Sequence, residues 1–129
     1  MAGRIVTLGE IMLRLKPPEM ERFFQSSVLE ATFGGGEGNV AISLAIFGKD
    51  VAFVTALPQN PIADACVRFL RGYGVDTSFI ARQGERMGIY FMEGGANQKG
   101  SAVVYDRAHS SISTATVDDF DWDAIFDGA

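Results

Sequence analysis

A glycine-rich stretch gives this sequence its clearest candidate for binding a small polar ligand. Phe33 to Ala41 reads FGGGEGNVA, and Gly34, Gly35 and Asn39 stand just before an apolar helical pattern. Glycine permits a close approach between backbone and ligand. The unpaired N–H groups at a helix start favour an anion or a set of hydroxyls. Asn39 could cap the helix or donate its amide to a ligand. The alternative is a tight turn before a core helix.

A second candidate lies in two runs of alternating polarity, 87–93 and 101–107, joined by residues 94–100. This pattern predicts a β-hairpin. Tyr90 and Met92 then share a face of one arm, and Tyr105 and Arg107 share a face of the other. A phenol beside a guanidinium suits a ligand that carries hydroxyls and a carboxylate. The alternative is an ordinary solvated hairpin face.

A dinucleotide site is a third, weaker possibility. Residues 36–41 fit the pattern G-x-G-x-x-A, which requires a loop directly after a first strand and an acidic residue at the end of the second strand. The next predicted strand, Val51 to Leu57, instead runs into Pro58, with no carboxylate at its tip. The sequence context therefore disfavours a nicotinamide or flavin.

Buried strands that alternate with amphipathic helices must position these residues. The expected strands are Arg4 to Leu8, buried on both faces, an alternating stretch through Leu15, Val28 to Phe33, Val51 to Leu57 and Val75 to Ala81. The expected helices run from about Asn39 to Phe47 and from about Pro61 to Tyr73, the second with Ile62, Cys66, Phe69, Leu70 and Tyr73 on its apolar face. Such alternation predicts a doubly wound α/β sheet.

Composition narrows the class of protein. The chain has 129 residues, of which 47% are hydrophobic, enough for one domain with a real core. A net charge of −5 without a basic run argues against nucleic acid as a partner. Cys66 is the single cysteine, so a disulfide framework is excluded. No apolar run is long enough to span a membrane, and we expect a soluble cytoplasmic protein.

Six short motifs, in this order, resemble the ribokinase-like (PfkB) carbohydrate kinases, most closely the 2-keto-3-deoxygluconate kinases. They are LGE at 8–10, GGGEGNVA at 34–41, LPQNP at 57–61, RGYGVDT at 71–77, GIYF at 88–91 and YDRA at 105–108. The resemblance implies a Rossmann-like doubly wound sheet with a small β-sheet lid. This chain would be the N-terminal part of one such domain, truncated, with its α/β core at about 4–10, 34–81 and 108–129. The lid would occupy about 11–33 and 87–107.

The resemblance also implies roles for individual residues. Gly34, Gly35 and Asn39 would form the sugar-contacting loop. Tyr90, Tyr105 and Arg107 would contact the substrate from the lid, with Arg107 pairing with its carboxylate. Many kinases of this fold have an Asp where this chain has Arg14, and a cation there fits an acidic sugar better than a neutral one.

The activity that the resemblance implies is ATP-dependent phosphorylation of a hydroxyl of 2-keto-3-deoxygluconate. The family's Gly-Ala-Gly-Asp motif, whose Asp is the catalytic base, does not occur here. We therefore expect the base, ATP and Mg²⁺ to belong to a longer protein, and this chain alone to bind neither cofactor and to be inactive. The partner would be a small sugar acid, with a homo-oligomer formed through the lid. Kinases of fructose or ribose, or a non-catalytic fragment for sugar-acid binding or dimerisation, remain alternatives.

Overall fold

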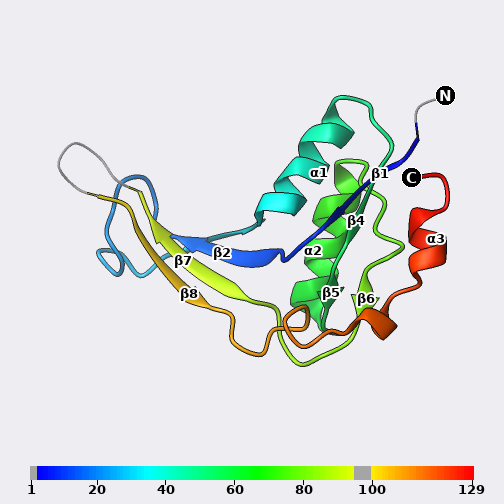
Figure 1. Cartoon of the computed structure of the whole chain (residues 1–129). Helices are drawn as coiled ribbons and strands as arrows, with labels where there is room; N and C mark the ends of the chain where they lie inside the picture. Colours follow the sequence, from blue (N-terminus) through cyan, green and yellow to red (C-terminus); the bar gives the residue numbers. More distant parts are fainter. Residues whose placement is uncertain (1–2, 95–99) are drawn as a thin grey trace.

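The computed structural model describes residues 3–94 and 100–129, which form an α/β core and a sheet that projects from it (Figure 1). Its strands are β1 (Ile5–Leu8), β2 (Met12–Lys16), β3 (Glu30–Gly34), β4 (Val51–Val54), β5 (Ala56–Leu57), β6 (Ala81–Arg82), β7 (Ile89–Glu93) and β8 (Ala102–Asp106). Its helices are α1 (Gly36–Ile46), α2 (Pro61–Gly72), a 3₁₀ turn η1 (Val117–Asp119) and α3 (Trp122–Phe126).

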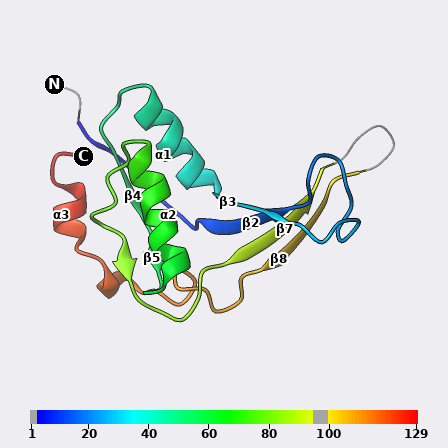
Figure 2. The same cartoon turned by 180° about the vertical axis from the view of Figure 1, so that it is seen from behind.

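The core is built on short parallel strands. β1 runs parallel to β4, and β5 runs parallel to β6. Helices α1 and α2 lie on one side of these strands and α3 on the other, as Figures 1 and 2 show from opposite directions. Val51 to Leu57 are all buried and supply the centre of the core. The α/β fold class predicted from the sequence is confirmed.

The projecting sheet, which we call the lid, has the strand order β3-β2-β7-β8. β2 pairs antiparallel with β3 and parallel with β7, and β7 pairs antiparallel with β8. The predicted hairpin is confirmed, with Tyr90 opposite Tyr105. Most of its predicted connection, residues 95–99, lies outside the described residues. Because β2 follows β1 directly, the lid is joined to the core at the end of a core strand.

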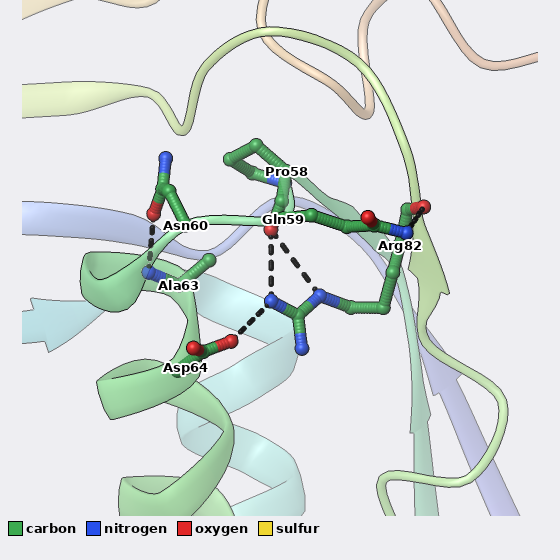
Figure 3. A network of polar contacts seen from close by, with 6 residues as sticks. All are labelled: Pro58, Gln59, Asn60, Ala63, Asp64 and Arg82. Carbon is green, nitrogen blue, oxygen red and sulfur yellow. Dashed lines mark hydrogen bonds and ion pairs between the residues drawn. The ribbon is translucent and has the colours of Figure 1, made fainter.

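A polar network fastens β5, β6 and the start of α2 together (Figure 3). The Arg82 guanidinium donates from Nε and Nη2 to the Pro58 carbonyl, at 3.2 and 2.9 Å, and from Nη2 to Asp64 Oδ1 at 2.6 Å. In return, Gln59 Nε2 donates to the Arg82 carbonyl at 3.2 Å. Asn60 caps α2, accepting the Ala63 N–H at 2.8 Å, and proline follows at the first helical position.

The first helix begins earlier than the sequence predicted. α1 starts at Gly36, and Asn39 N–H donates to the Gly35 carbonyl at 2.8 Å, so Asn39 lies inside the helix. The idea that Asn39 caps the helix is wrong, since the N-cap residue is Gly35 and no side chain caps it. A Cβ at Gly38 would meet Ile11 at 3.3 Å. Close packing therefore explains a glycine inside the first turn.

Three further expectations need correction. β1 is not buried on both faces: Ile5 and Leu8 are exposed, and β4 is the strand that pairs with β1 among the described residues. The predicted strand 75–81 is reduced to a bridge from Asp76 to Ala52 and to β6, because a turn closed by Ile80 N–H to Thr77 O interrupts it. On α2, the predicted apolar face includes two exposed side chains, Ile62 and Tyr73, at the two helix ends.

No helix in the described parts of the chain is both long enough and apolar enough to cross a membrane.

Candidate functional site

Three predicted site residues form a row across the lid. Arg14 on β2 pairs in register with Tyr90 on β7, and Tyr90 pairs with Tyr105 on β8. Side chains that are opposite each other in register lie on the same face of a sheet. The ring centroids of Tyr90 and Tyr105 are 6.1 Å apart, and Arg14 Nη2 is 3.5 Å from the Met92 sulfur. One face of the lid thus presents a guanidinium and two phenols side by side.

The glycine loop meets this row where β3 ends. A Cβ at Gly34 would lie 2.5 Å from the Tyr90 hydroxyl and 3.8 Å from Arg14 Cδ. A Cβ at Gly35 would overlap the Glu10 carbonyl oxygen and approach Ile11 Cα to 3.2 Å. Real Cβ atoms do not make such contacts, so Gly35 needs glycine because it meets backbone, whereas a larger residue at Gly34 would have to displace the Tyr90 hydroxyl. The loop and the row belong to one surface.

Arg107 extends that surface just beyond β8. Its guanidinium carbon lies 4.6 Å from the centre of the Tyr105 ring, and its Nη1 lies 3.6 Å from Glu10 Oε1. The Arg107 side chain is 51% exposed, so it has one partner in the lid and one in the core while still facing solvent. A half-exposed guanidinium of this kind is available to an anionic ligand.

Asn39 is the predicted site residue that lies apart. It is exposed on α1 and lines a shallow groove of about 310 Å³ with Ile42, Ser43, Ile46, Phe69 and Tyr73. None of Arg14, Tyr90 or Tyr105 is among the residues that line this groove. The structure therefore brings together Gly34, Gly35, Arg14, Tyr90, Tyr105 and Arg107, and leaves Asn39 apart from them on α1.

The pKa of Tyr90, in the middle of this row, is shifted by its surroundings. Burial raises the pKa of the Tyr90 phenol above its usual value, and the neighbouring Tyr105 adds to the shift, whereas the Arg14 guanidinium opposes it. Tyr90 therefore stays a neutral hydroxyl that can donate a hydrogen bond. With two guanidinium groups beside it, the surface suits a ligand that has both hydroxyls and a carboxylate.

The described residues do not form a metal site, since no group of three or more His, Cys, Asp or Glu side chains among them could hold an ion. The sequence also lacks the G-x-x-x-x-G-K-[ST] phosphate loop. The chemistry that the described surface offers is recognition of a ligand with hydroxyls and a negative charge.

Two further residues, Glu10 and Ser110, belong to the surroundings of Arg107, and the sequence analysis assigned them no role. The Ser110 hydroxyl donates to Glu10 Oε2 at 2.9 Å. One signal could have identified Glu10: it follows the carboxyl end of β1, and ligand sites of α/β sheets gather at that edge.

Comparison with known proteins identifies relatives along the whole chain. The family model described as pfkB family carbohydrate kinase matches residues 2–129. The crystal structure of 2-dehydro-3-deoxygluconokinase from Thermotoga maritima is 57% identical, with a TM-score of 0.96, and covers 98% of this chain. A 2-dehydro-3-deoxygalactonokinase from Haloferax volcanii is 35% identical over all 129 residues. A sugar kinase from Pyrococcus horikoshii in complex with ATP, 20% identical with a TM-score of 0.82, shares the fold. This chain spans 39% of the Thermotoga chain and 41% of the Haloferax protein.

Proposed function

Because this chain belongs to the pfkB family of carbohydrate kinases, we propose that the protein carrying it phosphorylates a hydroxyl of a keto-deoxy sugar acid such as 2-keto-3-deoxygluconate. The observation that carries the substrate class is the presence of two arginines, Arg14 and Arg107, on the same surface as two tyrosine hydroxyls. A neutral sugar gives a guanidinium no carboxylate to pair with. The Thermotoga and Haloferax relatives, a 2-dehydro-3-deoxygluconokinase and a 2-dehydro-3-deoxygalactonokinase, support the same class.

Each site residue has a role in this proposal. Arg107 pairs with the substrate carboxylate, and Arg14 adds a second positive charge on the lid. Tyr90 and Tyr105 donate hydrogen bonds to sugar oxygens. Gly34 and Gly35 let the loop backbone approach the sugar, and Asn39 donates its amide from the start of α1. Together these residues hold and orient the acceptor, a step on which phosphoryl transfer strongly depends.

ATP, Mg²⁺ and the catalytic base belong to parts of the protein outside this chain. Among the described residues no group of three or more His, Cys, Asp or Glu side chains could hold a metal ion, and we assign no step of phosphoryl transfer to them. ATP supplies the transferred phosphoryl group when it is bound, and we place the reaction in the cytoplasm, where ATP is available. This chain contributes the acceptor half of the site.

A coupled assay of ADP release tests the proposal. 2-Keto-3-deoxygluconate, 2-keto-3-deoxygalactonate, fructose and ribose are offered in turn to the complete protein that carries this chain and to residues 1–129 alone. We expect turnover of one or both sugar acids by the complete protein and none of the neutral sugars. Turnover of fructose or ribose in preference to the acids would overturn the substrate class. Absence of turnover, with sugar acid still bound, would favour a non-catalytic binding role.

We also propose that two copies of the protein associate through an apolar surface on the lid. Phe23, Phe24, Phe91 and Val104 line a depression of about 280 Å³ without polar lining, and Phe24 is 79% exposed. An aromatic side chain exposed to this degree is typical of an interface.

The Phe24→Asn variant tests this contact. Phe24 has φ of 63°, a conformation that Asn tolerates better than most residues, so the substitution removes apolar surface without backbone strain. We expect light scattering coupled to size-exclusion chromatography to show a shift towards monomer. Met20→Asn, at another exposed apolar position of the lid connection, serves as the control. An unchanged mass for Phe24→Asn would exclude this surface.

A further inference from the structure

Glu10 occupies the junction between the core and the lid. It follows β1 and precedes β2, so the chain passes from one part to the other at this residue. Its side chain is 20% exposed, which is unusual for a carboxylate on a connecting segment. A carboxylate that is largely withdrawn from water needs partners.

The two Glu10 oxygens have different partners. Oε2 accepts a hydrogen bond from Ser110 Oγ at 2.9 Å, and Oε1 lies 3.6 Å from Arg107 Nη1. Ser110 is 1% exposed, and its position is fixed by backbone bonds on both sides of it: its N–H donates to the Arg107 carbonyl at 3.3 Å, and its carbonyl accepts the Thr114 N–H at 3.1 Å. A rigid core hydroxyl therefore orients a carboxylate, which in turn faces the exposed guanidinium.

Gly88 provides the space for this arrangement. A Cβ at Gly88 would lie 2.7 Å from Glu10 Oε2, 2.9 Å from Arg107 Cβ and 3.1 Å from Met12 Cγ. Any larger residue would displace the carboxylate or the arginine. The first residue before β7 is thus small at the point where Glu10 and Arg107 approach each other.

We propose that Glu10 is the positioning residue for Arg107, and that Ser110 fixes Glu10 in turn. The inference rests on the proposed function in one respect, the pairing of Arg107 with a substrate carboxylate. Glu10 restrains the guanidinium from the core side while the Tyr105 ring restrains it from the lid side. The forked donors of Arg107 are then preorganised before the substrate arrives, which lowers the entropic cost of binding.

The opposite role makes an opposite prediction. If Glu10 merely competed with the substrate for Arg107, removing its charge would strengthen the binding of a sugar acid. If Glu10 positions Arg107, removing its charge weakens that binding even though the site becomes more positive. The isosteric substitution Glu10→Gln separates the two roles, because glutamine retains an acceptor for Ser110 while losing the ion pair.

Steady-state kinetics of the complete protein are the first test. For Glu10→Gln we expect KM for the sugar acid to rise roughly three- to tenfold, with kcat within about twofold of wild type, as for loss of uniform binding. In an Arg107→Ala background the same substitution should leave KM unchanged, since the group that Glu10 positions is gone. Glu85→Gln, an exposed carboxylate before β7, is the matched control and should have no effect. A lower KM, or an equal rise in the Arg107→Ala background, would overturn the proposal.

A second test does not depend on activity. The Nε–Hε group of Arg107 gives an NMR signal that can be assigned by its loss in Arg107→Lys. We expect restricted motion in the wild-type protein and faster motion in both Glu10→Gln and Ser110→Ala, with Ser110→Thr close to wild type because it keeps the hydroxyl. Unchanged motion in both variants would refute positioning by Glu10. If the wild-type protein turns over no sugar acid, the proposed function fails, and this measurement still decides the role of Glu10.

Discussion

At the scale of single residues, Arg107 carries the strongest claim about the ligand. Its guanidinium is held between an aromatic ring and a carboxylate yet remains half exposed. A planar guanidinium can donate two parallel hydrogen bonds to a carboxylate, whereas a lysine ammonium acts as a point charge. In the proposed function, Arg107 thus distinguishes an acid from a neutral sugar by geometry as well as by charge.

Replacing Arg107 by alanine should therefore cost the complete protein about 1–3 kcal/mol of transition-state stabilisation for the sugar acid, roughly a ten- to hundredfold drop in kcat/KM. Arg107→Lys should recover part of the loss because it keeps the charge. The ADP-release assay with the sugar acid measures both variants. Kinetics of Arg107→Ala equal to wild type would remove Arg107 from the site.

Tyr90 gives a pH-dependent prediction. Its folded-state pKa is raised, chiefly by burial, so its contribution to stability is fully present below the unfolded pKa of tyrosine and is lost as pH rises through the folded pKa. In a pH titration followed by absorbance at 295 nm, one phenol of the wild-type protein should ionise at a higher pH than an ordinary tyrosine. This ionisation step should be missing from Tyr90→Phe. Arg14→Met should move the ionisation of Tyr90 to a still higher pH, because Arg14 lowers the pKa of Tyr90. Ionisation of Tyr90 at a lower pH in Arg14→Met than in the wild type would contradict the effect assigned to Arg14.

The candidate residues could be predicted to different extents. The alternation of 101–107 was enough to place Tyr105 and Arg107 on one face, and the Arg107 guanidinium carbon does lie 4.6 Å from the centre of the Tyr105 ring. The Glu10–Arg107 pair joins residues 97 positions apart and depends on how the chain turns from β1 into β2. Local periodicity carries no information on such a turn, so the pairing of Glu10 with Arg107 could be found only from the fold.

At the scale of elements, the start of α1 shows what the glycine cluster does. Gly35 lies against the Glu10 carbonyl, whereas a Cβ at Gly36 would meet nothing within 4 Å. The neighbouring glycines therefore differ in purpose: one allows contact between two backbone segments, and the other is not required by packing.

Alanine at these two positions should have opposite effects. Gly35→Ala should lower the free energy of unfolding by about 1–3 kcal/mol through overpacking and weaken sugar-acid binding as the loop shifts. Gly36→Ala should be neutral or stabilise by up to about 1 kcal/mol, since alanine restricts the unfolded chain. Urea denaturation and sugar-acid titration of both variants measure this. Equal destabilisation by the two would show that the contact at Gly35 is not specific.

Elements with a strong pattern were predicted better than those shaped by tertiary contacts. α2 was expected at about 61–73 and lies at Pro61–Gly72, because proline at its start and an apolar stripe mark it clearly. The strand expected at 75–81 does not form over its whole length, because Asp76 Oδ1 accepts the Ser78 N–H and this local turn replaces extended pairing. β-propensity could not reveal that competition.

At the scale of the whole molecule, Cys66 reports on the integrity of the core. It is fully buried on α2 in the main hydrophobic cluster, and burial raises the pKa of its thiol to about 12. A thiol in this state reacts only when the core opens.

Cys66 should therefore resist a thiol-specific disulfide reagent in the native protein at pH 8 and react stoichiometrically in urea, with a labelling midpoint that matches the loss of helical circular dichroism. Cys66→Ser is the control for labelling at other groups. Rapid labelling of the native protein would mean that α2 opens independently of the core.

The Arg82 network has a consequence for how the molecule opens. One guanidinium joins the end of β5, the first turn of α2 and β6, so none of these segments can separate without breaking the same set of bonds. Backbone amides from 58 to 82 should consequently exchange with deuterated solvent in one cooperative event rather than segment by segment. The lid has no hydrogen bond to this network among the described residues. Its amides should therefore exchange independently of residues 58–82, so that opening of the lid sheet and opening of the core are separate events.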